Sequence, residues 1–311
     1  MARFLKPIVI IILAVLVIGL FFSRTIYRGF IKNNKQYFPS FIEKLIDRRE
    51  GRQKPSTISY RPEETIKILE GWTLDDVNKY LISTGKWSKE TLEKTYGQSK
   101  IDYRRNDNLE LPYDFSNQFS FLKDKPNYYS LEGYLFPDTY RIYTDASAKD
   151  IVVKMLENFD KKLTDKMRQD IISQGKTIYE IIIMASLIEK EAPIDYNDQD
   201  NRSARIVSDI FWGRIKSNQA LQSDATLSYL LNDKNASHSG SDLEIDSPYN
   251  SYKYRGLPPT PICNPGIKAI EAAIYPIKTD YNYFLTSLDG ENIYYARTYE
   301  EHLKNKYKYL K

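Results

Sequence analysis

The chain has 311 residues, of which 28% are charged and 41% are hydrophobic. This composition excludes a polytopic membrane protein and a disordered chain, and the length predicts about two domains. Cys263 is the only cysteine, which excludes an intrachain disulfide and a multi-cysteine zinc site. The first 30 residues contain four basic residues and no acidic one, which accounts for the whole net charge of +4. The rest of the chain is balanced in charge, so its composition gives no sign of a basic surface for nucleic acid.

An unbroken apolar run from Ile8 to Phe22 opens the chain. As a helix it would be about 22 Å long, and its flanks extend it toward the ~30 Å of a bilayer core. No small-x-small cleavage site follows the run, which favours an uncleaved signal-anchor over a cleaved signal peptide. Because basic residues lie on both sides, their distribution does not fix the orientation. We therefore expect a stub and transmembrane anchor over residues 1–30 and a juxtamembrane stalk over residues 31–56.

The hydrophobic period and the capping residues predict mixed helices and strands in the remainder. A polar, aromatic stretch without a clear period over residues 101–130 is expected to be a linker. The predicted elements are, in chain order, a strand at 65–69, a helix from Leu74, a helix at 88–96, one long amphipathic helix at 148–173, a helix at 178–192, a helix at 202–216, a hairpin at 281–297 and a final helix.

The helix predicted over residues 178–192 is apolar nearly all round, so it should be buried, and it ends in Glu189 and Glu191. Side chains at positions i and i+2 of a helix point to nearly opposite sides, so the two carboxyl groups should not face each other. Ala185, one turn before Glu189, is small and leaves space, whereas Leu187 stands before Glu191. We therefore expect Glu189 at a cavity wall, protonated as a general acid requires. The alternative is that both glutamates form the solvated end of a core helix.

Three polar segments further along the chain are rich in the amide, hydroxyl and aromatic side chains that bind sugars. Their alternative role is simply to shape loops. We interpret His238, in another polar loop, as solvated, and His302 as a surface or packing residue. The candidate cleft residues in these segments are Gln222, Asp224, Tyr249, Asn250 and Asn264.

Five ordered motifs carry a specific resemblance. They are Glu132-Gly133-Tyr134-Leu135-Phe136-Pro137-Asp138-Thr139-Tyr140, Ala185-Ser186-Leu187-Ile188-Glu189-Lys190-Glu191-Ala192, Leu221-Gln222-Ser223-Asp224, Ser247-Pro248-Tyr249-Asn250 and Gly256-Leu257-Pro258-Pro259. Together they resemble the endolytic murein transglycosylase (YceG-like) family over roughly residues 60–311. The segment 66–96 resembles the LysM-like subdomain of that family. Gly213, Ala225 and Ser251 depart from residues that are common in the family.

The resemblance implies an α+β protein with a single N-terminal transmembrane helix, a small LysM-like α/β subdomain at 57–100 and a larger mixed α+β catalytic domain at 131–311. It implies a single-pass protein of the bacterial inner membrane, with a cytoplasmic N-terminus and the catalytic domain outside. The implied partners are peptidoglycan glycan strands, the membrane and cell-wall synthases, with no nucleic acid. No metal or other cofactor is implied.

The resemblance also implies lytic cleavage of the β-1,4 bond between N-acetylmuramic acid and N-acetylglucosamine within nascent strands, which would end their elongation. Glu189 is expected to be the catalytic residue, and Glu191 joins the cleft residues above as a substrate-binding side chain. Two alternatives remain open. One is a muramidase-type hydrolase, for which Asp224 would be the second carboxylate. The other is a non-catalytic peptidoglycan-binding scaffold.

Overall fold

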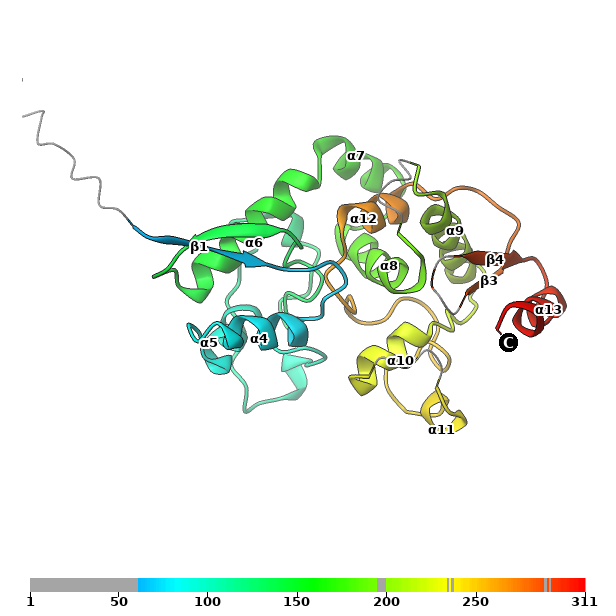
Figure 1. The fold of residues 1–311 in the computed structure, drawn as a ribbon, viewed down its shortest axis with the longest axis horizontal. Coiled ribbons are helices and arrows are strands. Elements are labelled where there is room, and N and C mark those ends of the chain that lie inside the picture. The colour runs from blue at the N-terminus through cyan, green and yellow to red at the C-terminus, as the bar shows by residue number, and fades with distance from the viewer. Residues whose placement is uncertain are drawn as a thin grey trace, which may run out of the picture. The chain divides into compact units, whose positions relative to one another are not determined.

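The computed structural model describes residues 61–194, 200–233, 235, 238–287, 290 and 292–310. The predicted anchor and stalk lie outside the described residues. From Pro62 onward the chain forms one compact unit of mixed helices and short strands (Figure 1). The expected mixed α+β class is therefore confirmed. Among the described helices, none is by itself long and apolar enough to cross a membrane.

A two-stranded antiparallel sheet joins the beginning of this unit to its middle. Strand β1 (Glu63–Lys67) pairs with β2 (Thr139–Tyr143). Alternate side chains of a strand face the same side, so Tyr140 and Ile142 of β2 lie in the core with Ile66 of β1. The segments predicted as 57–100 and 131–311 thus share this sheet, while the domain boundaries themselves stay a prediction.

Helices α4 (Leu74–Ser83) and α5 (Lys89–Tyr96) follow β1, with Thr73 and Ser88 as their N-caps. Both were expected from the sequence. The segment at 148–173 is not one helix, however, and this prediction is wrong. It forms α6 (Ala148–Lys162) and α7 (Asp165–Ser173), because Leu163 leaves the helical conformation and the Thr164 side chain caps the second helix. The apolar positions stay buried on both sides of the break.

Helix α8 (Ile178–Glu191) is the centre of the core, as its all-round apolar sequence predicts. Every residue from Ile181 to Ile188 is buried. Helices α7, α9 (Arg202–Lys216), α10 (Asp224–Leu231) and α12 (Ile267–Ile274) pack around it (Figure 1). A capping box formed by Thr177 and Glu180 begins the helix. The end of α8 therefore has a well-defined position.

The C-terminal part contains the expected hairpin and final helix. Strands β3 (Tyr283–Thr286) and β4 (Ile293–Ala296) pair antiparallel, and α13 (Tyr299–Tyr309) packs against both. The Thr286 hydroxyl donates a hydrogen bond to the backbone carbonyl of Glu191, which fixes β3 beside the end of α8. Strand β2, the helices α10 and α12 and the four-residue α11 (Gly240–Leu243) were not predicted from the sequence.

Glu132 is a buried carboxyl group that connects α4 to α10. Its two oxygens accept the backbone N–H of Leu74 at 3.0 and 3.2 Å, and one accepts the hydroxyl of Tyr229 at 3.0 Å. Burial raises the pKa of Glu132 to about 8 despite these hydrogen bonds. The folded protein therefore holds a proton here that the unfolded chain releases near its ordinary pKa of 4.5.

Replacing Glu132 with glutamine tests this assignment. The contribution of protonated Glu132 is complete below the unfolded pKa and is lost as the pH rises through about 8, so wild-type stability should fall across that window. Glu132→Gln should flatten this dependence in denaturant unfolding. The matching substitution of exposed Glu157, on α6, should leave the slope unchanged. Identical slopes for wild type and Glu132→Gln would contradict the raised pKa.

Candidate active site

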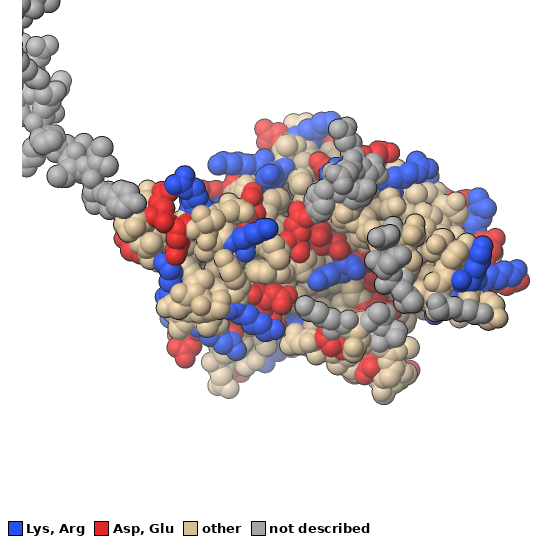
Figure 2. All heavy atoms as spheres, viewed as in Figure 1, with Lys and Arg blue, Asp and Glu red and all other residues tan. Residues whose placement is uncertain are grey.

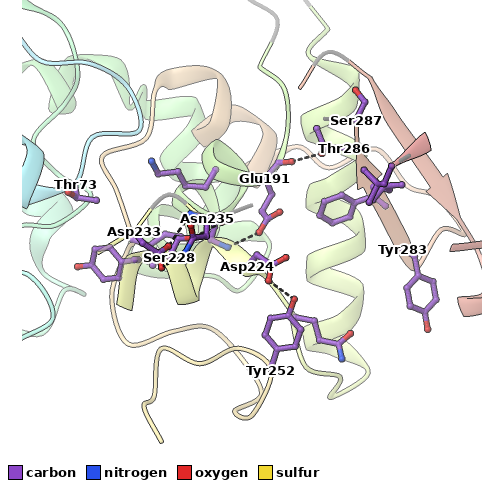
Figure 3. Close-up of a pocket in the computed structure, with 18 of the residues that line it drawn as sticks. Thr73, Glu191, Asp224, Ser228, Asp233, Asn235, Tyr252, Tyr283, Thr286 and Ser287 are labelled. Carbon is purple, nitrogen blue, oxygen red and sulfur yellow. Dashed lines mark hydrogen bonds between the residues drawn. The ribbon is translucent and has the colours of Figure 1, made fainter. Parts of the chain in front are cut away.

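A pocket of about 1030 Å³ lies where four parts of the unit meet (Figure 3). Its walls come from α4, from the end of α8, from the segment around α10, and from the hairpin with α13. This volume is at the upper end of the range for small-molecule sites, about 300–1,000 Å³. This volume is large enough for an extended ligand. Acidic and basic side chains are interspersed on the face shown in Figure 2, which suits a polar ligand.

Glu191, the last residue of α8, extends into this pocket between the α4 side and the hairpin side (Figure 3). Its Oε1 accepts hydrogen bonds from the Ser223 hydroxyl and, at 3.3 Å, from the backbone N–H of Ala225. Both donors belong to the beginning of α10, where unpaired N–H groups and the helix dipole favour a negative charge.

The protonation of Glu191 reflects opposing influences. Burial is the largest and raises the pKa of the carboxyl group, and the neighbouring Asp224 raises it further. The hydrogen bonds from Ser223 and Ala225 and the charge of Arg214 act in the opposite direction, and the pKa remains raised. A carboxyl group in a pocket that has a raised pKa, with donors placed to stabilise its anion, is suited to give up a proton and take one back.

Glu189 lies elsewhere, and the prediction that it forms the cavity wall is wrong for this pocket. It does not line the pocket, and its Oε2 accepts the backbone N–H of Gly266 at 3.1 Å. A Cβ atom on Gly71 would lie 3.7 Å from its Cγ, so the Gly71 loop lies directly against the Glu189 side chain. Burial raises the pKa of Glu189 to about 7. The i, i+2 geometry was correct, but it is Glu191 that faces the pocket.

Two further predicted residues, Gln222 and Asp224, line the pocket as expected. Asp224 Oδ1 accepts the hydroxyl of Tyr252 at 2.9 Å and lies 3.4 Å from Nδ1 of His238. The side chain of His238 is fully covered, with Nε2 3.4 Å from Asp233. The interpretation of His238 as solvated is therefore wrong, because two carboxylates from α10 and the segment that follows it enclose the ring.

The other three predicted cleft residues lie in the interior, which corrects their placement. Tyr249 hydrogen-bonds Thr260 at 2.8 Å. The side-chain amide of Asn250 donates to two backbone carbonyls, and that of Asn264 accepts from Leu135 and donates to Trp72. Neither asparagine side chain has any exposed surface. These groups hold loops in place, and none of the three lines the pocket.

Several pocket residues were not proposed from the sequence. Arg214, on α9, borders the pocket while donating to the backbone carbonyls of Leu221 and Asn282. Tyr252 lies two residues after a motif that the sequence analysis used. The α4 wall has no local signal, because only the β1–β2 pairing and the packing of α4 bring it to the pocket. It consists of Thr73, Asp75, Asp76 and Lys79. Among the described residues, no cluster of three or more His, Cys, Asp or Glu side chains is arranged to hold a metal ion.

Comparison with known proteins identifies the family. The YceG-like family model matches residues 32–308, which is most of the chain. The chain therefore belongs to the YceG-like family. A solved relative, a putative yceG-like protein of Listeria monocytogenes, is 30% identical with a TM-score of 0.63, over 84% of this chain and 80% of that one.

Two curated relatives of this YceG-like chain are named endolytic murein transglycosylase. The protein of Bacillus subtilis is 33% identical over 250 residues, which is 79% of this chain and 65% of the relative. The protein of Streptococcus pneumoniae D39 is 31% identical over 247 residues, which is 78% of this chain and 44% of the relative. The chain thus spans about half to two thirds of the length of these relatives.

Proposed function

We propose that the protein is a membrane-anchored endolytic peptidoglycan lytic transglycosylase. The observation that carries this proposal is a half-buried glutamate with a raised pKa, Glu191, in a large pocket that is lined on both sides of it, by the α4 wall and by the hairpin. The names of its relatives agree with it. The substrate is the β-1,4 bond between N-acetylmuramic acid and N-acetylglucosamine within nascent strands, so that cleavage ends strand elongation. This reaction consumes no water and needs no metal or other cofactor.

In the proposed mechanism Glu191, not Glu189, does the acid–base work. Protonated Glu191 gives its proton to the glycosidic oxygen as the bond from C1 of the muramyl residue breaks. The carboxylate, stabilised by Ser223 and the N–H of Ala225, then takes the proton of the C6 hydroxyl. O6 closes on C1 to give a 1,6-anhydro ring, and Glu191 is protonated again. One carboxyl group serves both steps, unlike the pair used by most glycosidases.

The end group of the product tests this function. The full chain in detergent, incubated with purified glycan strands, should release fragments ending in 1,6-anhydro-N-acetylmuramic acid, each lighter by one water than a reducing end in mass spectrometry. Reducing ends would instead support a muramidase, and Asp224, in the same pocket, is the second carboxylate available for one. Intact strands would overturn the catalytic proposal and leave a peptidoglycan-binding scaffold.

The pH dependence of cleavage should follow the groups around Glu191. Since the reaction starts from the protonated acid, activity should fall as the pH rises through the raised pKa of Glu191. Asp224 raises this pKa, so Asp224→Asn should shift the basic limb of kcat/KM to lower pH. Ser223 lowers it, so Ser223→Ala should shift the limb to higher pH. Shifts in the same direction, or none, would contradict the assignment of the limb to Glu191.

We further propose that Ile8–Phe22 anchors the protein in the bacterial inner membrane, with the N-terminus in the cytoplasm and the catalytic part outside. The apolar run and its basic flanks support this. Residues 57–100 would form a LysM-like subdomain, and cell-wall synthases would be partners. Protease treatment of spheroplasts should digest the part after the anchor, and its protection would refute this orientation.

A further inference from the structure

The pocket continues from Glu191 to the C-terminal hairpin and α13, where aromatic side chains line it. Tyr283 on β3 borders the pocket together with Tyr299 and His302, which lie one turn apart on α13. The ring centroids of Tyr283 and His302 are 5.4 Å apart with planes 25° from parallel, and those of Tyr283 and Tyr299 are 5.9 Å apart. Three rings from two elements therefore form one aromatic cluster, which we call the hairpin cluster.

The hairpin cluster is a surface and not part of the core. Tyr299 is 59% exposed, and α13 has no buried residue. Two neighbouring tyrosines do not belong to the cluster. Tyr281 stacks on Tyr295, and neither of them lines the pocket. Exposed aromatic side chains in a pocket whose lining mixes polar and apolar groups are a feature of ligand sites.

His302 supports the cluster from behind as a neutral ring. Burial lowers its pKa, and the nearby charges of Lys306 and Arg214 lower it further. Its Nδ1 has no hydrogen-bond partner within the part of the chain that the structure describes, and the ring stacks against Tyr283. A neutral ring in this half-buried position adds apolar area without the cost of removing a charge from water.

The position of the hairpin cluster relative to Glu191 indicates which class of ligand it would bind. In Figure 3, Tyr283 and Thr73 lie on opposite sides of Glu191. A polymer cleaved at Glu191 and extending in both directions would pass the α4 wall on one side and the hairpin cluster on the other. Pyranose rings have a face of C–H groups, which stacks on aromatic rings, and a rim of hydroxyls, which hydrogen-bonds phenolic and charged groups.

We propose that Tyr283 and Tyr299, supported by His302, form a sugar-stacking subsite that holds a pyranose ring of the glycan strand away from the cleaved bond. The identification of the ligand as a sugar ring rests on the proposed function. The presence of an aromatic surface in the pocket is independent of that function. The subsite gives the hairpin and α13 a role in selecting substrates, because only a strand long enough to reach them from Glu191 gains this contact.

Binding to uncleaved strands tests the subsite independently of catalysis. In the full chain carrying Glu191→Gln, Tyr299→Ala and Tyr283→Ala should each weaken binding of long strands on the order of tenfold, as expected for the loss of a ring contact. Tyr299→Trp should keep the affinity, because it keeps a flat face. Tyr307→Ala is the matched control, since Tyr307 is 72% exposed on the same helix and does not line the pocket.

Substrate length separates this inference from the proposed function. In the otherwise unaltered chain, Tyr299→Ala should lower kcat/KM for long strands and leave that for a tetrasaccharide nearly unchanged, with the same melting temperature. If wild type cleaves and Tyr299→Ala matches it on long strands in both assays, the subsite is refuted while the transglycosylase stands. If wild type binds but does not cleave, the enzymatic proposal fails and the binding assay still decides the subsite.

Discussion

Glu191→Gln is expected to lower the rate of glycan cleavage by about 10²–10⁴-fold or more, since general acid–base catalysis contributes about this much. Glutamine keeps the size of the side chain and can still accept hydrogen bonds from Ser223 and Ala225, so the pocket should keep its shape. It has no proton to give to the glycosidic oxygen. The loss should therefore appear in kcat, with little change in strand binding or melting temperature.

Glu189→Gln is the matched control, two residues away on the same helix. Its amide oxygen can still accept the N–H of Gly266, and the side chain does not line the pocket. We expect cleavage at close to the wild-type rate. The opposite pattern, with Glu189→Gln inactive and Glu191→Gln active, would restore the assignment of the acid made from the sequence and refute the one made from the pocket.

Gly133→Ala is expected to destabilise the fold by roughly 2–5 kcal/mol, the sum of a left-handed backbone and an overpacked contact. Gly133 has φ +87°, and a Cβ atom there would lie 2.5 Å from the Cβ of Pro261 and 2.9 Å from a methyl carbon of Ile182. Pro261 is rigid and Ile182 is in the core, so neither can move away. Differential scanning calorimetry should show a melting temperature lower by on the order of 10 °C.

Gly175→Ala separates the two contributions. Gly175, between α7 and α8, has φ +67°, but no described atom lies within 4 Å of the position of an added Cβ. Its substitution should cost only the backbone strain, about 1–2 kcal/mol. Equal losses in the two variants would show that the contact of Gly133 with Pro261 is not tight in solution.

Sequence patterns predicted the elements whose causes are local. The period of α8, its Thr177 cap and the caps of α4 and α5 are each encoded within a few residues, and all were confirmed. The break between α6 and α7 was missed because the four-residue apolar spacing continues through it. Only Leu163 and Thr164 leave the helix there, and spacing alone does not report such a local change.

Residues far away in the chain determine which of Glu189 and Glu191 faces the pocket. Helix geometry established that only one of them could face a given side. Gly71 and Gly266 lie against the Glu189 side chain on one side of α8. The beginning of α10 and strand β3 form the walls of the pocket on the other side, where Glu191 lies. Ala185 was a misleading local signal, because loops from other parts of the chain lie against the Glu189 side chain. The α4 wall of the pocket could not be found for the same reason.

The asparagines illustrate a further limit. Asn250 and Asn264 have the side chains that sugar sites use, and Asn250 lies in a motif shared with the family. Their amides are instead satisfied by backbone groups, the nearest of which for Asn264 belong to Trp72 and Leu135. A sequence motif therefore marks both groups that shape a site and groups that touch a ligand, and only the fold separates the two.

A crystal structure of the Glu191→Gln chain with an uncleaved glycan oligosaccharide would test the central claim most directly. The account predicts a glycosidic oxygen within hydrogen-bonding distance of residue 191, about 2.6–3.2 Å, with the strand running between α4 and the hairpin. A strand bound with its glycosidic oxygen beside Glu189, or outside this pocket, would contradict it.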